Sequence, residues 1–286
     1  MIRRIVAGLD GSDSGRTAGK YAACLAAGLG AEAEALSITD VRPLESPMMR
    51  DFTAHLGLEP YETYTEILRK SLESRTRGII EQFLTDAKEI GLPEENTSTH
   101  TEVGLVIDIL CERAKLADLI VIGQYGENLG FSRGFLGSTS EQLVRRAARP
   151  VMVCPPSHAP VKRPLIAYDG STMSDDALRL GCDFASQMDC DLTVLIVADG
   201  DQMNAESAEN VRERARSYLC CAHVDSEIEI AEGDPEQEII AHAVQNDHGM
   251  IIMGAFGHGR IRKLVIGSTT VHVMRNSTVP VMLTRH

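Results

Sequence analysis

The sequence predicts an α/β protein of two tandem doubly wound domains, each a five-stranded parallel sheet with helices on both faces. The 286-residue chain repeats its own pattern about halfway along. Each copy alternates short apolar runs with helical stretches, which is typical of a parallel sheet. Runs such as LIVIG (119–123) and MIIMG (250–254) are apolar at nearly every position, as in strands buried on both faces.

An internal repeat defines the two domains. RRIVAGLDGS near the start resembles RPLIAYDGS from Arg163, and GQYGENLGFSRGFLGSTS resembles GAFGHGRIRKLVIGST further along. Four landmarks recur in the same order: Asp10 with Asp169, Gly123 with Gly254, Gly137 with Gly267, and Pro150 with Pro280. Repeated landmarks indicate a duplication. We therefore assign residues 1–156 and 161–286 to the two domains, joined by a proline-rich connector.

The elements of the first copy follow in order. An apolar run ending at Leu9 predicts the first strand, and a stretch with small residues on one face predicts a helix before the second strand. Residues 42–59 are an insertion relative to the second copy, and apolar residues at helical spacing then predict a long helix from Tyr61 to Ile90. The strand at 119–123, a glycine loop, a helix and a final strand at 151–154 end the copy.

The second copy repeats this order with shorter connections. Its counterpart of the long helix is predicted at residues 204–221, and its last strand at 279–283. In sheets of this kind ligands bind at the carboxyl ends of the strands, where the winding direction switches. We expect the functional site there in each copy.

Composition limits the possible functions. Forty-one acidic against 28 basic residues give a formal charge of −13, which a nucleic-acid surface would have to overcome. No apolar run reaches the roughly 20 residues that span a bilayer, and the start reads as a strand rather than a signal peptide. Seven scattered cysteines show no metal-ligand spacing. We expect a cytoplasmic protein with reduced thiols, no catalytic metal, and neither nucleic acid nor membrane as a partner.

The strongest motif is the glycine loop of the second copy. Gly254 and Gly257 are predicted to take positive φ and to let the backbone approach a ligand. Nine residues later a helix begins, and its free N–H groups and dipole favour an anion. Hydroxyls and positive charges add to this predicted phosphate site: His258, Arg260, Arg262, Lys263, Gly267, Ser268, Thr269 and Thr270. A surface loop with a serine N-cap is the alternative, which the recurrence in both copies disfavours.

The first copy carries a longer and less basic version of this loop. Ten residues separate Gly126 from Gly137, and Arg133 is their only basic residue. The predicted phosphate-binding residues are Gly123, Gly126, Arg133, Gly137, Ser138, Thr139 and Ser140. On charge alone, we expect the second site to bind a polyphosphate more tightly than the first.

An aspartate ends the first strand of each copy. Asp10 stands in LDGS and Asp169 in YDGS, so each carboxylate is expected at the ligand crevice. There it can accept a hydrogen bond from a ribose or help to hold a metal on phosphates. The structural alternative is an Asx-turn or a helix N-cap, which Asp-Gly-Ser also forms readily.

These motifs resemble the ATP-binding pattern of the universal stress protein family, Gly-x2-Gly-x9-Gly-(Ser/Thr). The second copy matches it, the first matches it with one extra residue, and the similarity covers nearly the whole chain. The resemblance implies an adenine nucleotide alpha hydrolase-like fold in each domain. It also implies further site residues: Ile38 and Val197 at the adenine, Ile122 and Met253 before the loop glycine, and Ser140 and Thr270 closing the phosphate site.

The resemblance also implies a ligand and an assembly. The ligand is ATP, with AMP or ADP as alternatives, with or without Mg²⁺. The last strands of the two domains are implied to pair across a two-fold axis, which gives an intramolecular pseudo-dimer, and two such chains can pair again as a homodimer.

Three functions remain open at this point. The leading one is regulatory binding of an adenine nucleotide with at most slow hydrolysis or autophosphorylation, because we see no placed general base or activated nucleophile. The second is a scaffold protein of the same fold that binds no nucleotide. The third is an enzyme of the alpha hydrolase type that consumes ATP with an acceptor substrate.

Overall fold

The structure is a computed structural model, and it describes residues 1–40, 61–126, 137–200, 203–222, 224–256 and 266–285. In the first half the elements are β1 (Arg4–Leu9), α1 (Asp13–Leu29), β2 (Glu32–Asp40), α3 (Tyr61–Ile90), a 3-10 turn (Glu94–Asn96), β3 (Thr97–Gly104), α4 (Val106–Ala114), β4 (Leu119–Gly123), α5 (Ser138–Arg146) and β5 (Val151–Cys154). The predicted bounds of the long helix are confirmed.

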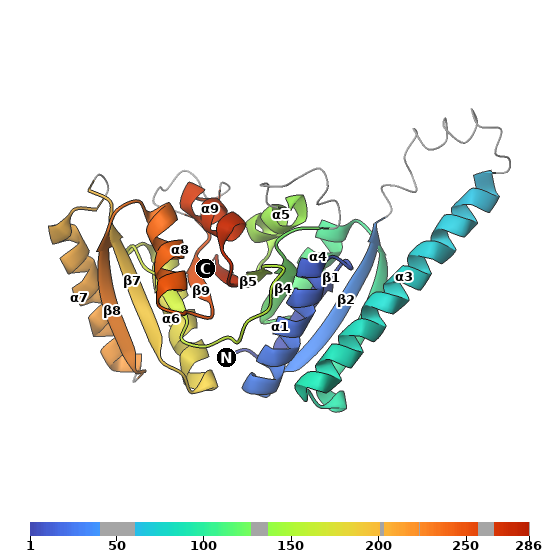
Figure 1. The fold of residues 1–286 in the computed structure, drawn as a ribbon, viewed down its shortest axis with the longest axis horizontal. Coiled ribbons are helices and arrows are strands. Elements are labelled where there is room, and N and C mark those ends of the chain that lie inside the picture. Colours follow the sequence, from blue (N-terminus) through green and yellow to red (C-terminus); the bar gives the residue numbers. More distant parts are fainter. Residues whose placement is uncertain (41–60, 127–136, 201–202, 223, 257–265, 286) are drawn as a thin grey trace.

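The second half repeats this order with shorter elements. They are β6 (Leu165–Ala167), α6 (Thr172–Met188), β7 (Leu192–Ala198), α7 (Ala205–Ala222), β8 (Ser226–Glu232), α8 (Pro235–Gln245), β9 (Ile251–Gly254), α9 (Ser268–Asn276) and β10 (Val281–Thr284). Side by side in Figure 1, the halves differ most in α3, which runs past the end of the sheet, whereas its counterpart α7 is shorter.

All ten strands form one sheet in the order β3-β2-β1-β4-β5-β10-β9-β6-β7-β8. Within each half the pairings are parallel, as in β1 with β2 and with β4. The halves join where β5 and β10 pair antiparallel, with Met282 opposite Met152. This is the strand pairing that the sequence resemblance implied. The doubly wound fold predicted for each half is confirmed.

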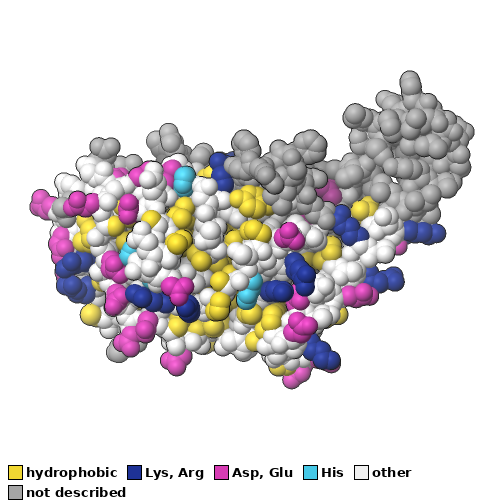
Figure 2. Space-filling view, in the orientation of Figure 1, with side chains coloured by type: hydrophobic (Ala, Val, Ile, Leu, Met, Phe, Trp, Pro, Cys, Tyr) yellow, Lys and Arg dark blue, Asp and Glu magenta, His cyan; other side chains and the backbone are white. Residues whose placement is uncertain are grey.

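Helices cover both faces of this sheet. Strand side chains point alternately to the two faces, so Ile5 and Ala7 join one apolar cluster and Val6 the other. The first cluster packs under α1, α3, α6 and α7, and the second under α4, α5, α8 and α9. On the face shown in Figure 2, basic and acidic side chains are interspersed, with hydrophobic side chains between them near the middle.

The first helix of each half has a defined start and end. Ser12 caps α1 by accepting a hydrogen bond from the Gly15 amide, and Gly30 ends it with φ 63°. In the second half Ser171 caps α6 in the same way. Asp-Gly-Ser therefore turns the chain from a strand into a helix in both copies. Among the described residues, no helix is long and apolar enough to cross a membrane.

Candidate functional site

The candidate site of each half lies where the winding of the sheet reverses. The chain moves from β1 to β2 on one side and later returns to β4 on the other side of β1. Asp10 directly follows β1, and Gly123 ends β4. A crevice at such a point is the usual ligand position in doubly wound sheets. In the second half, Asp169 and Gly254 lie at the equivalent position beside β6 and β9.

The two strand-end aspartates both form the turn that starts the helix. Oδ1 of Asp10 accepts hydrogen bonds from the Ser12 amide at 3.0 Å and from its hydroxyl at 2.6 Å. Asp169 Oδ1 accepts from the Ser171 amide at 2.9 Å. The structural alternative is thus present in both copies. A carboxylate has about four acceptor positions, so an aspartate in this turn can also accept a hydrogen bond from a ligand hydroxyl.

The glycine that ends β4 is required by packing. A Cβ on Gly123 would lie 2.6 Å from Ser14 Oγ and 2.7 Å from the Gly15 amide nitrogen. A Cβ on Gly254 would lie 2.7 Å from the Cβ of Met173. The positive φ predicted at Gly254 is wrong, because this residue still belongs to strand β9. It is the close approach of the neighbouring helix that excludes a side chain.

Hydrogen bonds hold the starts of α5 and α9 against these strand ends. The Gly137 amide donates to the Gln124 carbonyl at 3.1 Å, and Ser140 Oγ donates to the Gly123 carbonyl at 2.9 Å. In the second half, Thr270 Oγ1 donates to the Gly254 carbonyl at 3.1 Å. Both side chains are buried. Ser140 and Thr270 therefore position the loop ends, and their hydroxyls are used within the protein.

The helices α5 and α9 begin without a side-chain cap. Their N-caps are Gly137 and Gly267, and neither helix has a side-chain cap hydrogen bond. This differs from α1 and α6, which a serine caps. The first amides of α5 and α9 belong to the predicted residues Ser138, Thr139, Ser268 and Thr269. An uncapped helix start is a place where backbone N–H groups can bind an anion.

Four apolar residues named for the site lie on one face of the sheet. Ile122 and Met253 are buried, and Ile38 and Val197 are half-buried. All four belong to the cluster under α4, α5, α8 and α9. Each half therefore brings its apolar pair to the same face as its uncapped helix. Gly126 also lies near the strand-one aspartate, since a Cβ there would be 3.4 Å from Asp10 Oδ2.

The interiors of both glycine loops lie outside the described residues. The predicted site residues Arg133, Gly257, His258 and Arg260 lie in these interiors. Sequence reasoning missed Ser14, whose hydroxyl donates at 2.5 Å to the Tyr125 carbonyl and accepts from the Tyr125 amide at 3.2 Å. It also missed Gln124, which is 3% exposed. A polar residue in GQYG where the other copy has alanine in GAFG was the available indication.

The fold and site define a tandem α/β protein with a glycine loop at the switch point of each half. A model of the universal stress protein family matches residues 1–155 and again residues 160–285. The chain therefore belongs to this family, as a tandem universal stress protein with two family domains.

Similar proteins include a relative over the full chain and two solved structures. Universal stress protein Slr1230 of Synechocystis sp. is 28% identical over 299 residues, which cover 99% of this chain and all of the relative. A universal stress protein from Archaeoglobus fulgidus has a crystal structure that matches with a TM-score of 0.72 at 20% identity, covering 99% of this chain and 98% of that one. A universal stress protein in complex with cAMP matches over 55% of this chain at 25% identity, with a TM-score of 0.37.

Proposed function

We propose that this protein binds ATP, or AMP or ADP in its place, as a regulatory ligand in the stress response. One observation carries the proposal: in each half a helix starts at a glycine N-cap directly after the predicted phosphate loop, with no side-chain cap hydrogen bond among the described residues. The phosphates bind at the first amides of α5 and α9, with or without Mg²⁺. The adenine packs against Ile38 and Ile122 in one half, and against Val197 and Met253 in the other. The bounds of the two units are residues 1–156 and 161–286, and the protein acts in the cytoplasm.

The proposal includes at most slow hydrolysis or autophosphorylation. A fast phosphoryl transfer needs a placed base or a nucleophile near the phosphates. The buried hydroxyls of Ser14, Ser140 and Thr270 all donate to backbone carbonyls. They hold the site in shape and are not presented to a ligand as nucleophiles.

One alternative has an observation in its favour. Both strand-one aspartates and both buried helix hydroxyls already have partners within the chain. A scaffold of the same fold that binds no nucleotide would show these contacts too. The position of α5 and α9 favours the nucleotide, because both helices start at a glycine directly after a predicted phosphate loop, where their first amides can bind an anion.

Nucleotide released by denaturing the protein as purified, and identified by mass spectrometry, tests the proposal. Titration calorimetry of the emptied protein with ATP, ADP, AMP and cAMP then gives the affinities and the number of sites. Gly126→Val and Gly257→Val each place a branched side chain in one loop, and each is expected to remove one site. Protein that carries no nucleotide and binds none of the four would support the scaffold instead.

A further inference from the structure

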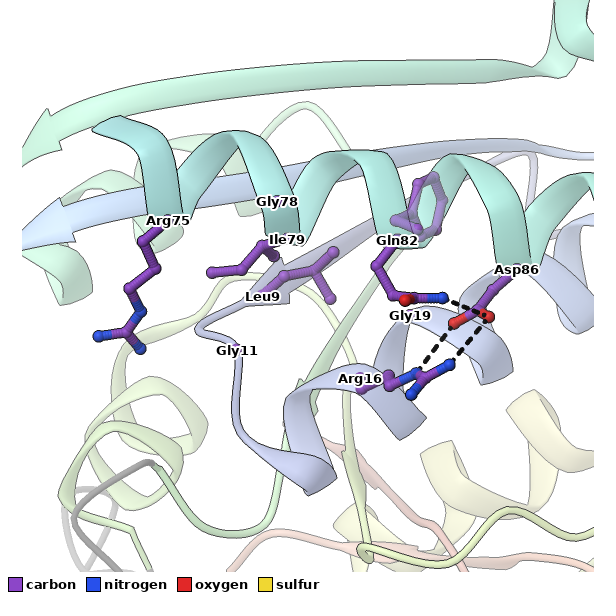
Figure 3. Close-up of a pocket in the computed structure, with 10 residues that line it drawn as sticks. Leu9, Gly11, Arg16, Gly19, Arg75, Gly78, Ile79, Gln82 and Asp86 are labelled. Atoms are coloured by element: carbon purple, nitrogen blue, oxygen red, sulfur yellow. Dashed lines mark hydrogen bonds and ion pairs between the residues drawn. The ribbon is translucent and has the colours of Figure 1, made fainter. Parts of the chain in front are cut away.

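The first half contains a cavity that the nucleotide site does not use. It lies between α1 and α3 and has a volume of ≈ 280 Å³. In Figure 3 Leu9 and Ile79 point into it, and the glycine positions Gly19 and Gly78 lie on the two helices that border it. Gly78 adds no side chain and has nothing within 4 Å of its missing Cβ, so the space beside it is open. The lining of this cavity is mainly apolar.

This cavity and the candidate nucleotide site are on opposite faces of the sheet. Leu9, Ile79 and Phe83 belong to the apolar cluster under α1 and α3. The residues named for the adenine, such as Ile38 and Ile122, belong to the cluster under α4 and α5. A ligand in the cavity therefore does not compete for the nucleotide's space.

Two arginines give the cavity a positive rim. Nη2 of Arg75 donates at 2.8 Å to the Asp10 carbonyl, which holds this exposed side chain near Gly11 at the cavity. Arg16 reaches Asp86 through a long contact of 3.4 Å. A guanidinium has five N–H donors in a planar fork that fits a carboxylate.

Among the described lining residues, the one acidic group is Asp86, and its charge is compensated. Asp86 is 4% exposed and accepts a hydrogen bond of 3.0 Å from Gln82 Nε2. Arg16 and Lys20 lie 3.4 Å and 4.0 Å from its carboxylate oxygens. Arg16 and Arg75 are the basic side chains among the described residues that line the cavity.

The second half shows the same frame with larger side chains at two of the equivalent positions. Counted from the N-cap serines, Leu178 takes the place of Gly19, Tyr168 that of Leu9 and Asp175 that of Arg16. The Tyr168 hydroxyl donates to Asp175 at 2.7 Å. The side chains of Tyr168 and Leu178 are buried. Arg214 donates to the Gly170 carbonyl, much as Arg75 does to that of Asp10. Larger side chains thus stand in the second half where Gly19 and Leu9 line the cavity of the first, and an arginine bonds to the turn after the first strand in both halves.

We propose that the α1–α3 cavity binds a small monocarboxylate with an apolar body. A dry cavity of about 150 Å³ accepts benzene, so the larger volume here fits a straight or aromatic body of roughly eight carbons. The apolar body packs against Leu9, Ile79 and Phe83. Its carboxylate lies at the rim, where Arg75 and Arg16 donate to it.

Calorimetric titration of the full chain with octanoate tests this binding, with octanol and octylamine as neutral and cationic probes of equal length. Octanoate is expected to bind once per chain and at least about tenfold more tightly than either analogue, as a charge-assisted pair predicts. Octanol binding as tightly as octanoate, or no saturable binding of octanoate, would overturn the proposal.

Matched variants locate the site. Arg75→Met should weaken octanoate binding at least about tenfold, whereas Arg214→Met, its counterpart in the second half, should leave it unchanged. Gly19→Leu introduces the residue that the second half has at this position, Leu178. Since a Cβ there meets Phe83 at 3.2 Å, Gly78→Leu, at a position with open space around the Cβ, serves as the second filling variant. Unchanged affinity in a folded Gly78→Leu and in Arg75→Met would overturn the assignment. None of these results depends on nucleotide binding.

Discussion

The side-chain amide of Gln124 donates a hydrogen bond of 2.7 Å to the carbonyl oxygen of Arg275, which joins the first half's loop to the last turn of α9 in the second. A second bond of 2.5 Å goes from the same amide to the Met274 carbonyl, and the Tyr125 hydroxyl donates to Arg275 at 2.7 Å. These carbonyls are among those that a helix end leaves without partners. The start of α9 belongs to the second candidate site, and the C-terminal end of the same helix is therefore capped by residues of the first half.

The opposite contact is weaker, although the two halves are duplicates. Nη1 of Arg285 lies 3.4 Å from the Ala147 carbonyl at the end of α5, and its guanidinium lies 5.7 Å from the Phe256 ring centre. Ala255 and Phe256 stand where the first half has Gln124 and Tyr125. The contacts that join the two halves are thus unequal.

Gln124→Met should destabilise the protein more than Arg285→Met. The first variant keeps the volume but leaves the Met274 carbonyl without its donor and the Arg275 carbonyl with the Tyr125 hydroxyl alone, and such a loss costs about 1–3 kcal/mol. The second removes a long contact on a half-buried side chain, which we expect to cost below about 1 kcal/mol. Urea unfolding of both variants measures the difference. Equal losses would show that the Gln124 bonds add nothing beyond the weaker contact.

Gly123→Ala should lower stability, whereas Gly126→Ala should not. The new Cβ at 123 would lie 2.6–2.8 Å from atoms of Ser14 and Gly15, two of them backbone, and overpacking of this kind costs about 1–3 kcal/mol. At 126 the nearest atom is Asp10 Oδ2 at 3.4 Å, an ordinary contact. Thermal and urea unfolding compare the two. If Gly126→Ala is the more damaging, the packing role assigned to Gly123 is incorrect.

Local sequence patterns predicted most of the architecture. The bounds of α3 follow from helical spacing of apolar residues, and the parallel sheet of each half follows from a repeated strand–helix alternation. Boundaries set by pairing were less accurate: the last strand begins at Val281, not at 279. There the register with Val153 and Met152 decides where the ladder begins.

Features that depend on contacts between distant residues were not predictable. Gly254 was expected to need positive φ, yet what excludes its side chain is Met173, on another helix. The cap from Gln124 to Arg275 spans 151 residues of sequence. The cavity also results from how α1 lies against α3, which neither helix reveals alone. In the candidate site, the sequence identified the types of residue. Contacts between distant residues determine which of these residues hold the loop.

Gly78→Ala should stabilise the protein. Gly78 lies in the middle of α3, is exposed, and has nothing within 4 Å of its missing Cβ. A helical glycine loses more backbone entropy on folding than alanine, by about 0.5–1 kcal/mol. Gly19→Ala is the matched variant on α1, where the Cβ meets Phe83 at 3.2 Å and Leu9 at 3.3 Å. Urea unfolding should show a gain only for the first, and a gain for Gly19→Ala of the same size would contradict the packing described here.

Acidification should destabilise the protein through His248. Burial lowers the pKa of His248, and the nearby positive charges of Arg163 and His242 lower it further, while the bond of its ring to the Arg163 carbonyl and the charge of Glu229 raise it. Nδ1 lies 2.9 Å from that carbonyl, and Nε2 is buried with no hydrogen-bond partner among the described residues.

The sign of this effect follows from proton binding. Between the depressed folded pKa and the unfolded value of about 6.5, the unfolded chain binds more protons than the folded chain. Stability due to His248 is therefore complete above pH 7 and falls as the pH drops through 6.5, by at most about 1.4 kcal/mol per pH unit. It levels off below the folded pKa.

His248→Asn tests this because an amide can still donate to the Arg163 carbonyl but does not titrate. Urea unfolding at several pH values between 7.5 and 5 should show a flatter profile for this variant than for the unmodified protein. His272→Asn, at a side chain that is 39% exposed beside Glu236, serves as the control and should keep the slope. Parallel profiles for His248→Asn and the unmodified protein would mean that the buried imidazole is not the group whose protonation opposes folding.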